Sequence, residues 1–267
     1  MVGESADGPR GLGVTAEGFG LRGPRGRAFQ GVGLDAEPGS LIAIEGPSGS
    51  GRTCLLLSLT GRMKPTEGHA AVGPFRLPKQ MAAVRRISAL AHVPGITDLD
   101  PALTVGEHLR ERALLQRRFS GSVRGLLRPR YERAAEARLR IDSALSAAGL
   151  EREALPKGSR TAVRDLERVE ALRLSVALAL VGRPRLLGVD DTDLKLSDPE
   201  RAEVWALLRA LTEAGTTVLA VCREAPEGAV TVSTGSADKP SGEEREQDRR
   251  DRDDKEAADA LAEAGRA

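Results

Sequence analysis

The chain has 267 residues, with 40 basic and 39 acidic side chains and a formal net charge of +1 at pH 7. This balance provides no overall attraction to nucleic acid or anionic lipid, so we predict no nucleic-acid partner. Aromatic residues make up only 2% of the chain, so the core must be built from Leu, Val, Ala and Ile. Such a composition suits a parallel sheet buried between helices, which favours the α/β class.

Both ends of the chain are expected to be flexible. Residues 1–12 are rich in Gly, Pro and charge, and residues 234–267 carry scarcely any large apolar side chain. Segments of this kind cannot bury enough apolar surface to form a core. The mixed-charge run 243–256 could instead form a solvated single helix. The start lacks a signal-peptide core and Arg173 interrupts the most apolar later run, so we expect a cytoplasmic chain.

Between the ends, short β-like runs alternate with helical ones. This alternation predicts crossover helices and a largely parallel sheet. The predicted strands are 27–35, 41–45, 69–72, 87–93, 185–190, 216–222 and 229–233.

Three helical regions have recognisable limits. One helix is predicted to begin near Gly51 and to end at the glycine cap Gly61. Another is predicted from Ser197, with Pro in its first turn, to Gly215. Residues 104–180 are helical in pattern throughout, with breaks near 121–129, 149–158 and 161, which indicates an all-helical insertion into the α/β core.

The segment GPSGSGRT at residues 46–53 follows the apolar run 41–45 and precedes a helix. Gly46, Gly49 and Gly51 allow the backbone to curl so that successive N–H groups point at phosphate oxygens. The helix start adds its positive end, and Thr53 is the hydroxyl expected to bind Mg²⁺. The alternative is an ordinary Gly-Ser turn. The candidate nucleotide-binding residues are Gly46, Pro47, Ser48, Gly49, Ser50, Gly51, Arg52, Thr53 and Cys54.

Arg52 occupies the position where this pattern has lysine. It keeps the positive charge but replaces a compact ammonium with a larger planar fork, so binding can survive where γ-phosphate geometry does not. A second glycine pattern, 18–23, matches a dinucleotide fingerprint, yet Pro24 and Gly26 follow where a helix must begin. We interpret 18–23 as a Gly-rich turn.

Two carboxylates follow the apolar run LLGV at residues 186–189. Asp190, at a strand's carboxyl end beside the loop, is placed to hold Mg²⁺ directly or through water. Asp191 is then the candidate to polarise the attacking water. The alternative for Asp191 is a helix or turn cap within the acidic stretch 190–193.

Several segments together resemble the nucleotide-binding subunit of ATP-binding-cassette (ABC) transporters over about residues 13–233. Residues 46–53 look like the Walker A motif, KPTEG at 64–68 resembles the turn before the next strand, and LTVGEHL at 103–109 is close to a helix-start motif of the family. VGRPRLL at 181–187 leads into Walker B as in many members. The resemblance implies a P-loop NTPase core with a mostly parallel sheet, an antiparallel β region and a helical subdomain at about 94–180.

The resemblance also exposes departures at the positions that serve the nucleotide. The signature motif aligns with LERVE at 166–170, where Glu167 replaces the serine. The Q-loop glutamine aligns with His92, the catalytic glutamate with Asp191 and the switch histidine with Arg223. Asp191 and His92 are thus the weak catalytic candidates. Phe19 and Phe29 are the only rings near the position of the adenine-stacking residue.

These observations predict an ATP-binding subunit of an ABC-type transporter that binds ATP and Mg²⁺ and couples to a separate membrane permease. It would dimerise with itself or with another cassette and lie at the inner face of the membrane through its partner. Loss of the donors that stabilise the transferred phosphoryl group predicts slow or absent hydrolysis, so its standing as an enzyme is open. The alternative is a non-catalytic regulatory or scaffold protein on the same fold.

Overall fold

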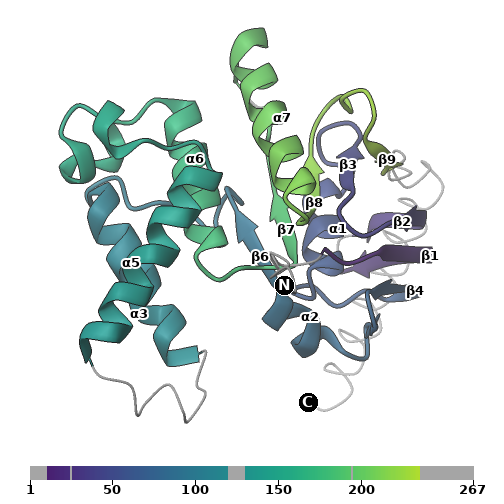
Figure 1. Ribbon diagram of the computed structural model, residues 1–267. Helices are drawn as coiled ribbons and strands as arrows, with labels where there is room; N and C mark the ends of the chain where they lie inside the picture. Colours follow the sequence, from purple (N-terminus) through teal and green to yellow (C-terminus); the bar gives the residue numbers. More distant parts are fainter. Residues whose placement is uncertain (1–10, 25, 120–129, 194, 235–267) are drawn as a thin grey trace, which may run out of the picture.

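The computed structural model describes residues 11–24, 26–119, 130–193 and 195–234. Within these ranges no helix combines the length and the hydrophobicity that crossing a bilayer requires. The described part consists of a parallel sheet, an antiparallel sheet and a helical arm, with the arm standing to one side of the two sheets (Figure 1).

The parallel sheet has the order β6-β7-β8-β3-β9. Its strands are β3 (Leu41–Glu45), β6 (Ser88–Ala91), β7 (Leu186–Val189), β8 (Thr217–Val221) and β9 (Val230–Ser233). Every residue of β6, β7 and β8 is buried, which explains why these strands are continuous apolar runs instead of alternating ones. Because all pairs are parallel, the carboxyl ends of the strands lie along one edge, where the phosphate loop follows β3.

The antiparallel sheet has the order β2-β1-β4-β5. Its strands are β1 (Val14–Gly23), β2 (Gly26–Ala36), β4 (Glu67–Val72) and β5 (Phe75–Leu77). Helix α1 (Arg52–Leu59) and the short helix α2 (Met81–Ile87) lie beside it. One hydrophobic cluster joins the inner face of this sheet, α1 and the parallel sheet, with Leu55, Leu56 and Leu59 completely buried.

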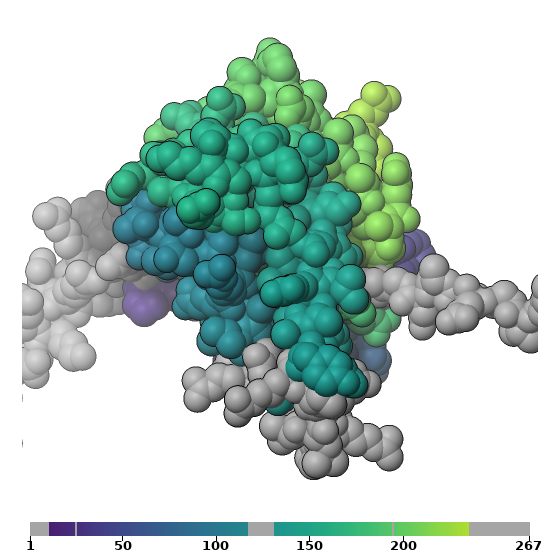
Figure 2. All heavy atoms as spheres, turned by 60° about the vertical axis from the view of Figure 1, so that its left-hand side comes forward, coloured from purple at the N-terminus to yellow at the C-terminus, as the bar shows by residue number. Residues whose placement is uncertain are grey.

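The helical arm contains α3 (Val105–Phe119) and α5 (Arg130–Ala147), followed by three short 3-10 turns, Arg152–Ala154, Gly158–Arg160 and Val163–Asp165. Turned toward the viewer, the arm forms the near face of the molecule (Figure 2). Helix α6 (Arg168–Leu180) contacts both α5 and β6, so a second hydrophobic cluster runs without interruption from the arm to the sheet. Helix α7 (Asp198–Glu213) covers β8 and β3.

The α/β class with parallel and antiparallel regions is confirmed, and each predicted strand coincides with one in the structure. The helix limits are also close: Ser197 caps α7 in a capping box with Glu200, and Gly61 and Gly215 follow α1 and α7 with φ of 74° and 93°. Of the predicted strand 87–93, only Ser88–Ala91 is extended, because residue 87 ends α2 and His92 has φ of 51°.

Several predictions about the antiparallel region were wrong. Residues 18–23 are part of β1 and not a turn; Gly18, with φ of 55°, lies at a register shift, while Phe19 points into the core. Strand β5 and helix α2 were not predicted. Two residues of the expected flexible start are buried, since the Leu12 N–H donates to Thr217 Oγ1 at 2.9 Å. Of the expected tail, Thr234 is buried and the rest lies outside the described residues.

Candidate functional site: the phosphate loop and the strand ends beside it

The phosphate loop connects the end of β3 at Glu45 to the start of α1 at Arg52. Two of its glycines cannot be replaced without moving other backbone. A Cβ on Gly46 would lie 2.5 Å from Thr234 Oγ1, and one on Gly51, which has φ of 84°, would lie 2.0 Å from the Ala28 carbonyl oxygen. The loop is therefore held between β2 and the end of β9. Its rim, residues 47–49, is exposed and so is open to a ligand.

The loop and the helix start differ in what they offer to an anion. The Ser50 side chain is buried and shares a 2.6 Å hydrogen bond with Thr234 Oγ1, while its N–H donates to Pro47 O at 3.2 Å, so both groups serve the loop itself. Leu55 donates the first N–H of the helical pattern, to Gly51 O. The amides of Arg52, Thr53 and Cys54 precede it and are those that a helix leaves without an internal acceptor, so they are the groups at this end of α1 that could bind an anion.

Thr53 and Asp190 lie in contact across the carboxyl edge of the sheet. Thr53 Oγ1 donates to Asp190 Oδ2 at 2.7 Å, and the Asp191 N–H donates to Asp190 Oδ1 at 2.9 Å. The Asp190 side chain is only 2% exposed, and burial raises the pKa of its carboxyl although both hydrogen bonds act in the opposite direction.

This pair of oxygens fits Mg²⁺. The ion takes hard oxygen ligands, keeps several waters, and is usually held by one or two protein groups together with substrate phosphates. The described residues contain no group of three or more His, Cys, Asp or Glu side chains that could hold a metal by themselves. A Mg²⁺ ion would therefore depend on Thr53, Asp190 and phosphate oxygens together.

The two catalytic candidates lie next to this pair. His92 follows β6 and Asp190 follows β7, and these two strands are paired with Ala91 opposite Val189. The His92 and Asp190 side chains therefore come from matching positions at the ends of neighbouring strands, and Asp191 is the next residue. Asp191 has φ of 47° and is half-buried. Burial lowers the pKa of His92, while the charges of Asp191, Asp190 and Asp98 act to raise it. The imidazole is thus a neutral group among carboxylates near pH 7.

Arg52 does not point along the rim of the loop. Its Nη1 donates to the Cys222 carbonyl oxygen at 2.5 Å, so the guanidinium reaches from the start of α1 to the residue after β8. Its positive charge also acts on Asp190, where it slightly opposes the effect of burial on the carboxyl pKa. The side chain therefore connects the phosphate loop to the strand that leads to Arg223.

The Arg223 side chain is exposed, and it is the backbone N–H of Arg223 that bonds to the segment after β7. The Arg223 N–H donates to Asp193 Oδ2 at 2.6 Å, and Thr192 Oγ1 donates to Val221 O at 2.9 Å. These bonds join the segment after β7 to the segment after β8. Among the described residues, the guanidinium makes no hydrogen bond or ion pair with the phosphate loop.

Glu167 lies at the N-cap of α6, apart from the phosphate loop of the same chain. It forms a capping box with Glu170, whose Oε2 accepts the Glu167 N–H at 2.9 Å. Arg168 Nη1 donates to Lys195 O at 2.5 Å. A carboxylate therefore already occupies the amino end of α6, where an external anion would otherwise bind.

The structure excludes the two rings considered for adenine stacking. Phe19 and Phe29 are 0% and 1% exposed and pack on each other with ring centroids 5.8 Å apart. Neither face is available to a base. Sequence reasoning also missed Thr234 and the Cys222 carbonyl, which hold Ser50 and Arg52, because each lies more than a hundred residues away from its partner.

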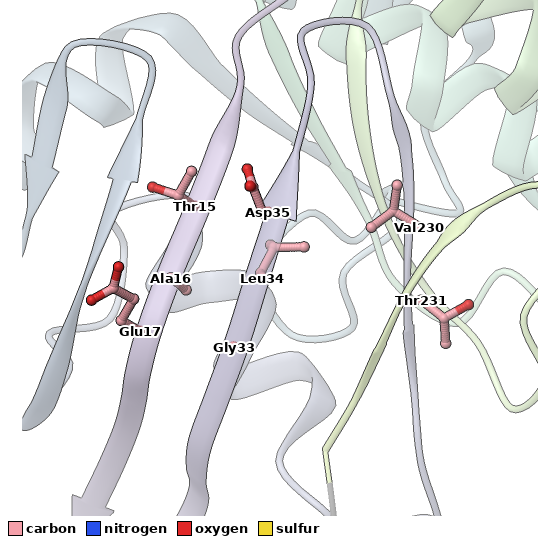
Figure 3. A pocket seen from close by; sticks show the side chains of 8 residues that line it. All are labelled: Thr15, Ala16, Glu17, Gly33, Leu34, Asp35, Val230 and Thr231. Atoms are coloured by element: carbon pink, nitrogen blue, oxygen red, sulfur yellow. The ribbon is translucent and has the colours of Figure 1, made fainter.

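A hollow of about 500 Å³ lies elsewhere, beside β1, β2 and β9 (Figure 3). Its lining includes Thr15, Glu17, Asp35 and Thr231, and none of its residues comes from the loop or from the ends of β6 and β7. It is open and partly acidic, which does not suit a phosphate. The candidate site is therefore defined by the loop amides and the Thr53 to Asp190 contact and not by this hollow.

Comparison with known proteins agrees with this geometry. The family model described as ABC transporter matches residues 29–193. The "Nod factor export ATP-binding protein I" of Cupriavidus metallidurans is 31% identical over 186 residues, which are 70% of this chain and 54% of that protein. The "Fe(3+) ions import ATP-binding protein FbpC" of Streptomyces avermitilis is 32% identical over 204 residues, 76% of this chain and 53% of that protein. The chain thus spans about half the length of these curated relatives.

Solved structures show the same fold. The structure of cbiO1 from Clostridium perfringens, part of the ABC transporter complex cbiONQ, matches with a TM-score of 0.62 at 20% identity and covers 79% of this chain and 78% of that one. A dimeric bacterial ABC transporter cassette matches with a TM-score of 0.63 at 21% identity and covers 84% and 95%. Since the family model also covers more than half of the chain, this protein belongs to the ABC transporter family and has the P-loop NTPase fold of its ATP-binding cassettes.

Proposed function

We propose that this chain is the ATP-binding subunit of an ABC-type membrane transporter and binds MgATP at residues 46–54. The observation that carries the proposal is the 2.7 Å contact between Thr53 and Asp190 at the amino end of α1. It brings a hydroxyl and a buried carboxylate together where the loop amides would hold phosphates. A solved ATP-binding cassette that matches with a TM-score of 0.59 at 23% identity is bound to ADP and Pi.

In this proposal, each group has a separate task. The amides of residues 52–54 and the dipole of α1 bind the phosphate oxygens. Thr53 and Asp190 hold Mg²⁺, which when bound neutralises phosphate charge and orients the terminal phosphate. Arg52 supplies positive charge from the side of β8, where it is anchored to the Cys222 carbonyl.

We further propose that hydrolysis is slow or lost. Asp191 stands where family members have glutamate, and its side chain is one methylene shorter, about 1 Å, which is enough to misplace a water and lower the rate by orders of magnitude. His92 is short and neutral near pH 7, and the Arg223 side chain is exposed and makes no hydrogen bond or ion pair with the loop in the described part of the chain. Glu167 adds negative charge at the segment that would face the phosphate of a partner cassette. These changes all reduce transition-state stabilisation.

The partner and the location follow from the same assignment. The chain would couple to a separate integral membrane permease and form a homo- or heterodimer of cassettes at the inner face of the membrane. The cassette would comprise residues 13–233, with the helical subdomain at about 94–180. The curated relatives are named as ATP-binding proteins of both export and import, so the direction of transport stays open.

Nucleotide binding is tested by titrating the full chain with a fluorescent ATP analogue with and without Mg²⁺. We expect Mg²⁺-dependent binding that is weakened at least about tenfold in Asp190→Ala, because the ion would lose the buried carboxylate that is proposed to hold it. Asp35→Ala, which removes an exposed carboxylate from β2, is the matched control and should bind like the wild type. Equal affinities of Asp190→Ala and Asp35→Ala would contradict the proposed site.

The hydrolysis part of the proposal is tested by steady-state phosphate release from MgATP. We expect turnover far below the rate of about 1 to 1,000 per second that is usual for enzymes. Turnover above a few per second that disappears in Asp191→Asn would show that the remaining groups are sufficient, and the proposal of impaired hydrolysis would then fail.

A second function, a regulatory or scaffold protein, is favoured by one observation in particular. Arg52 and Glu167 are both engaged within the chain, with Arg52 on Cys222 O and Glu167 capping α6. A cassette whose nucleotide-facing groups have internal partners can keep its shape without a nucleotide. Binding that is absent, or that is unaffected by both Arg52→Ala and Asp190→Ala, would support the scaffold function over the transporter subunit.

A further inference from the structure

Three arginines meet at the edge of the parallel sheet opposite to the phosphate loop. Arg62 follows α1, Arg85 lies in α2 and Arg112 lies in α3. Arg62 is bonded to Ser88, the first residue of β6, Arg85 is bonded to the turn that precedes Arg62, and Arg112 is bonded to the end of α6, which packs on β6. The phosphate loop follows the carboxyl end of β3, whereas Ser88 lies at the amino end of β6. Because the strands are parallel, the three arginines and the phosphate loop lie at opposite ends of the strands.

The hydrogen bonds of these arginines go to carbonyl oxygens and to one hydroxyl. Arg62 donates from Nη1 to Thr60 O at 2.8 Å and to Ser88 Oγ at 2.9 Å, and from Nη2 to Ser88 O at 3.2 Å. Arg85 Nη1 donates to Gly61 O at 2.7 Å. Thr60 and Gly61 are consecutive, so the two guanidinium groups are attached to the same turn.

The third arginine comes from the helical arm. Arg112 Nε donates to Leu178 O at 2.9 Å, in the last turn of α6. Among the described residues, no ion pair includes any of the three arginines. Two helix ends contribute roughly half a negative charge each, against three positive charges. The cluster therefore keeps an excess of about two positive charges.

The charges of the three groups act on each other. The pKa of Arg62 is lowered to about 10, first by burial and then by the charges of Arg85 and Arg112. Burial also lowers the pKa of Arg112. No carboxylate contributes to either shift, so the repulsion between these cations is not relieved within the described residues.

The cluster still has donors for a ligand. A guanidinium carries five N–H groups, and the recorded bonds use three on Arg62 and one on each of the others. None of their nitrogen atoms is among the buried atoms without a partner in the described part of the chain. Among the described residues, Arg62 Nε and both Nη atoms of Arg112 donate no hydrogen bond, so these atoms are not fully buried, and Arg85 is itself exposed.

We propose that Arg62, Arg85 and Arg112 form a second anion site, which binds a phosphate dianion that is either free or part of a lipid headgroup. An excess of about two positive charges matches a dianion, and the planar forks of arginine bind phosphate oxygens in pairs. Since α1 and α2 pack on the sheets and α3 belongs to the arm, the bound phosphate connects the arm to the sheets. This site is independent of the proposed nucleotide site.

The test measures the thermal unfolding midpoint of the full chain in rising sodium phosphate, with NaCl adjusted to constant ionic strength and without Mg²⁺. Phosphate at 100 times its Kd is expected to raise the midpoint by about 5 to 10 °C. Arg85→Gln should weaken phosphate binding at least about tenfold. Arg86→Gln, the exposed neighbour on the same helix, is the matched control and should respond like the wild type.

Three results would overturn the proposal. If Arg85→Gln and Arg86→Gln respond alike, or if no chain responds, the cluster only caps the ends of α1 and α6. If Arg52→Gln removes the response while Arg85→Gln keeps it, the phosphate occupies the loop instead.

A second measurement identifies the source of the phosphate. Cosedimentation is compared with vesicles of phosphatidylcholine alone and with vesicles containing phosphatidic acid. Binding to the acidic vesicles that requires Arg85 and is displaced by free phosphate indicates a headgroup. A response to free phosphate without vesicle binding indicates a soluble phosphate.

Discussion

The contact between Thr53 and Asp190 can be tested by a substitution that removes one hydroxyl and little else. Thr53→Val keeps the branched shape at the start of α1 but leaves Asp190 Oδ2 without the donor that now lies 2.7 Å away. The Asp190 carboxylate is 2% exposed and keeps only the Asp191 N–H at 2.9 Å. A hydrogen bond to a charged group contributes about 1.5–3 kcal/mol to the free energy of unfolding.

This loss should lower the thermal midpoint by roughly 3–12 °C at pH 7, since 1 kcal/mol corresponds to about 2–4 °C for a domain of this size. The gap from the wild type should narrow on acidification, because the hydroxyl stabilises the charged form of Asp190 and that form disappears as the carboxyl takes up a proton. In the titration with MgATP, Thr53→Val should also lose most of the increase in affinity that Mg²⁺ provides.

Thr53→Ser is the control, because it keeps the hydroxyl and removes only a methyl group. Its unfolding midpoint and its Mg²⁺ dependence should lie much closer to the wild type than those of Thr53→Val. If the serine and valine variants unfold together, the hydrogen bond does not stabilise the fold. If both bind MgATP as tightly as the wild type, Thr53 is not a ligand of the ion.

Three further predictions concern the catalytic candidates and the loop. Asp191→Glu should raise ATP turnover by about tenfold or more, with the Kd for MgATP nearly unchanged, because the longer side chain advances the carboxylate by about 1 Å. An unchanged rate in a phosphate-release assay would mean that side-chain length is not the cause of the slow hydrolysis. His92 has a lowered pKa, so the unfolded chain binds its proton more readily and the wild type loses stability as pH falls below about 6.5. In urea unfolding, the free energy of unfolding of His92→Gln should therefore rise relative to that of the wild type at pH 5.5 but not at pH 7.5. A rise of equal size at both pH values would contradict the lowered pKa of His92. Gly51→Ala should be less stable than Gly49→Ala by about 1–3 kcal/mol, since both residues have a positive φ but only Gly51 would meet the Ala28 carbonyl oxygen; equal unfolding midpoints would argue against this close packing.

The phosphate loop could be predicted from the sequence because its requirements are local. Glycines at 46, 49 and 51 between an apolar strand and a helix specify a curled backbone, whatever the rest of the chain does. The buried strands β3, β7 and β8 were predictable for a similar reason, as continuous apolar runs between helices. The meeting of Thr53 and Asp190 followed from one more rule, that the carboxyl ends of parallel strands share an edge.

The antiparallel region was harder to predict because its pattern is ambiguous. Strand β1 contains GFGLRG, and glycine-rich stretches of this kind usually indicate turns. It is extended here because Phe19 is buried against Phe29 of β2 and because both β2 and β4 pair with it. That stabilisation comes from segments which the local pattern does not include.

The sequence by itself determined the residue types around the candidate site, including Arg52 in place of lysine, and the resemblance aligned Asp191, His92 and Glu167 with functional positions of the family. Only the tertiary structure decided what these side chains contact. Arg52 is bonded to a carbonyl 170 residues away, Phe19 and Phe29 are buried, and Arg62, Arg85 and Arg112 come together from the turn after α1, from α2 and from α3. The physical reason is that the type and spacing of residues limit the local backbone, whereas the partner of a long polar side chain depends on which distant segments the folded core brings beside it.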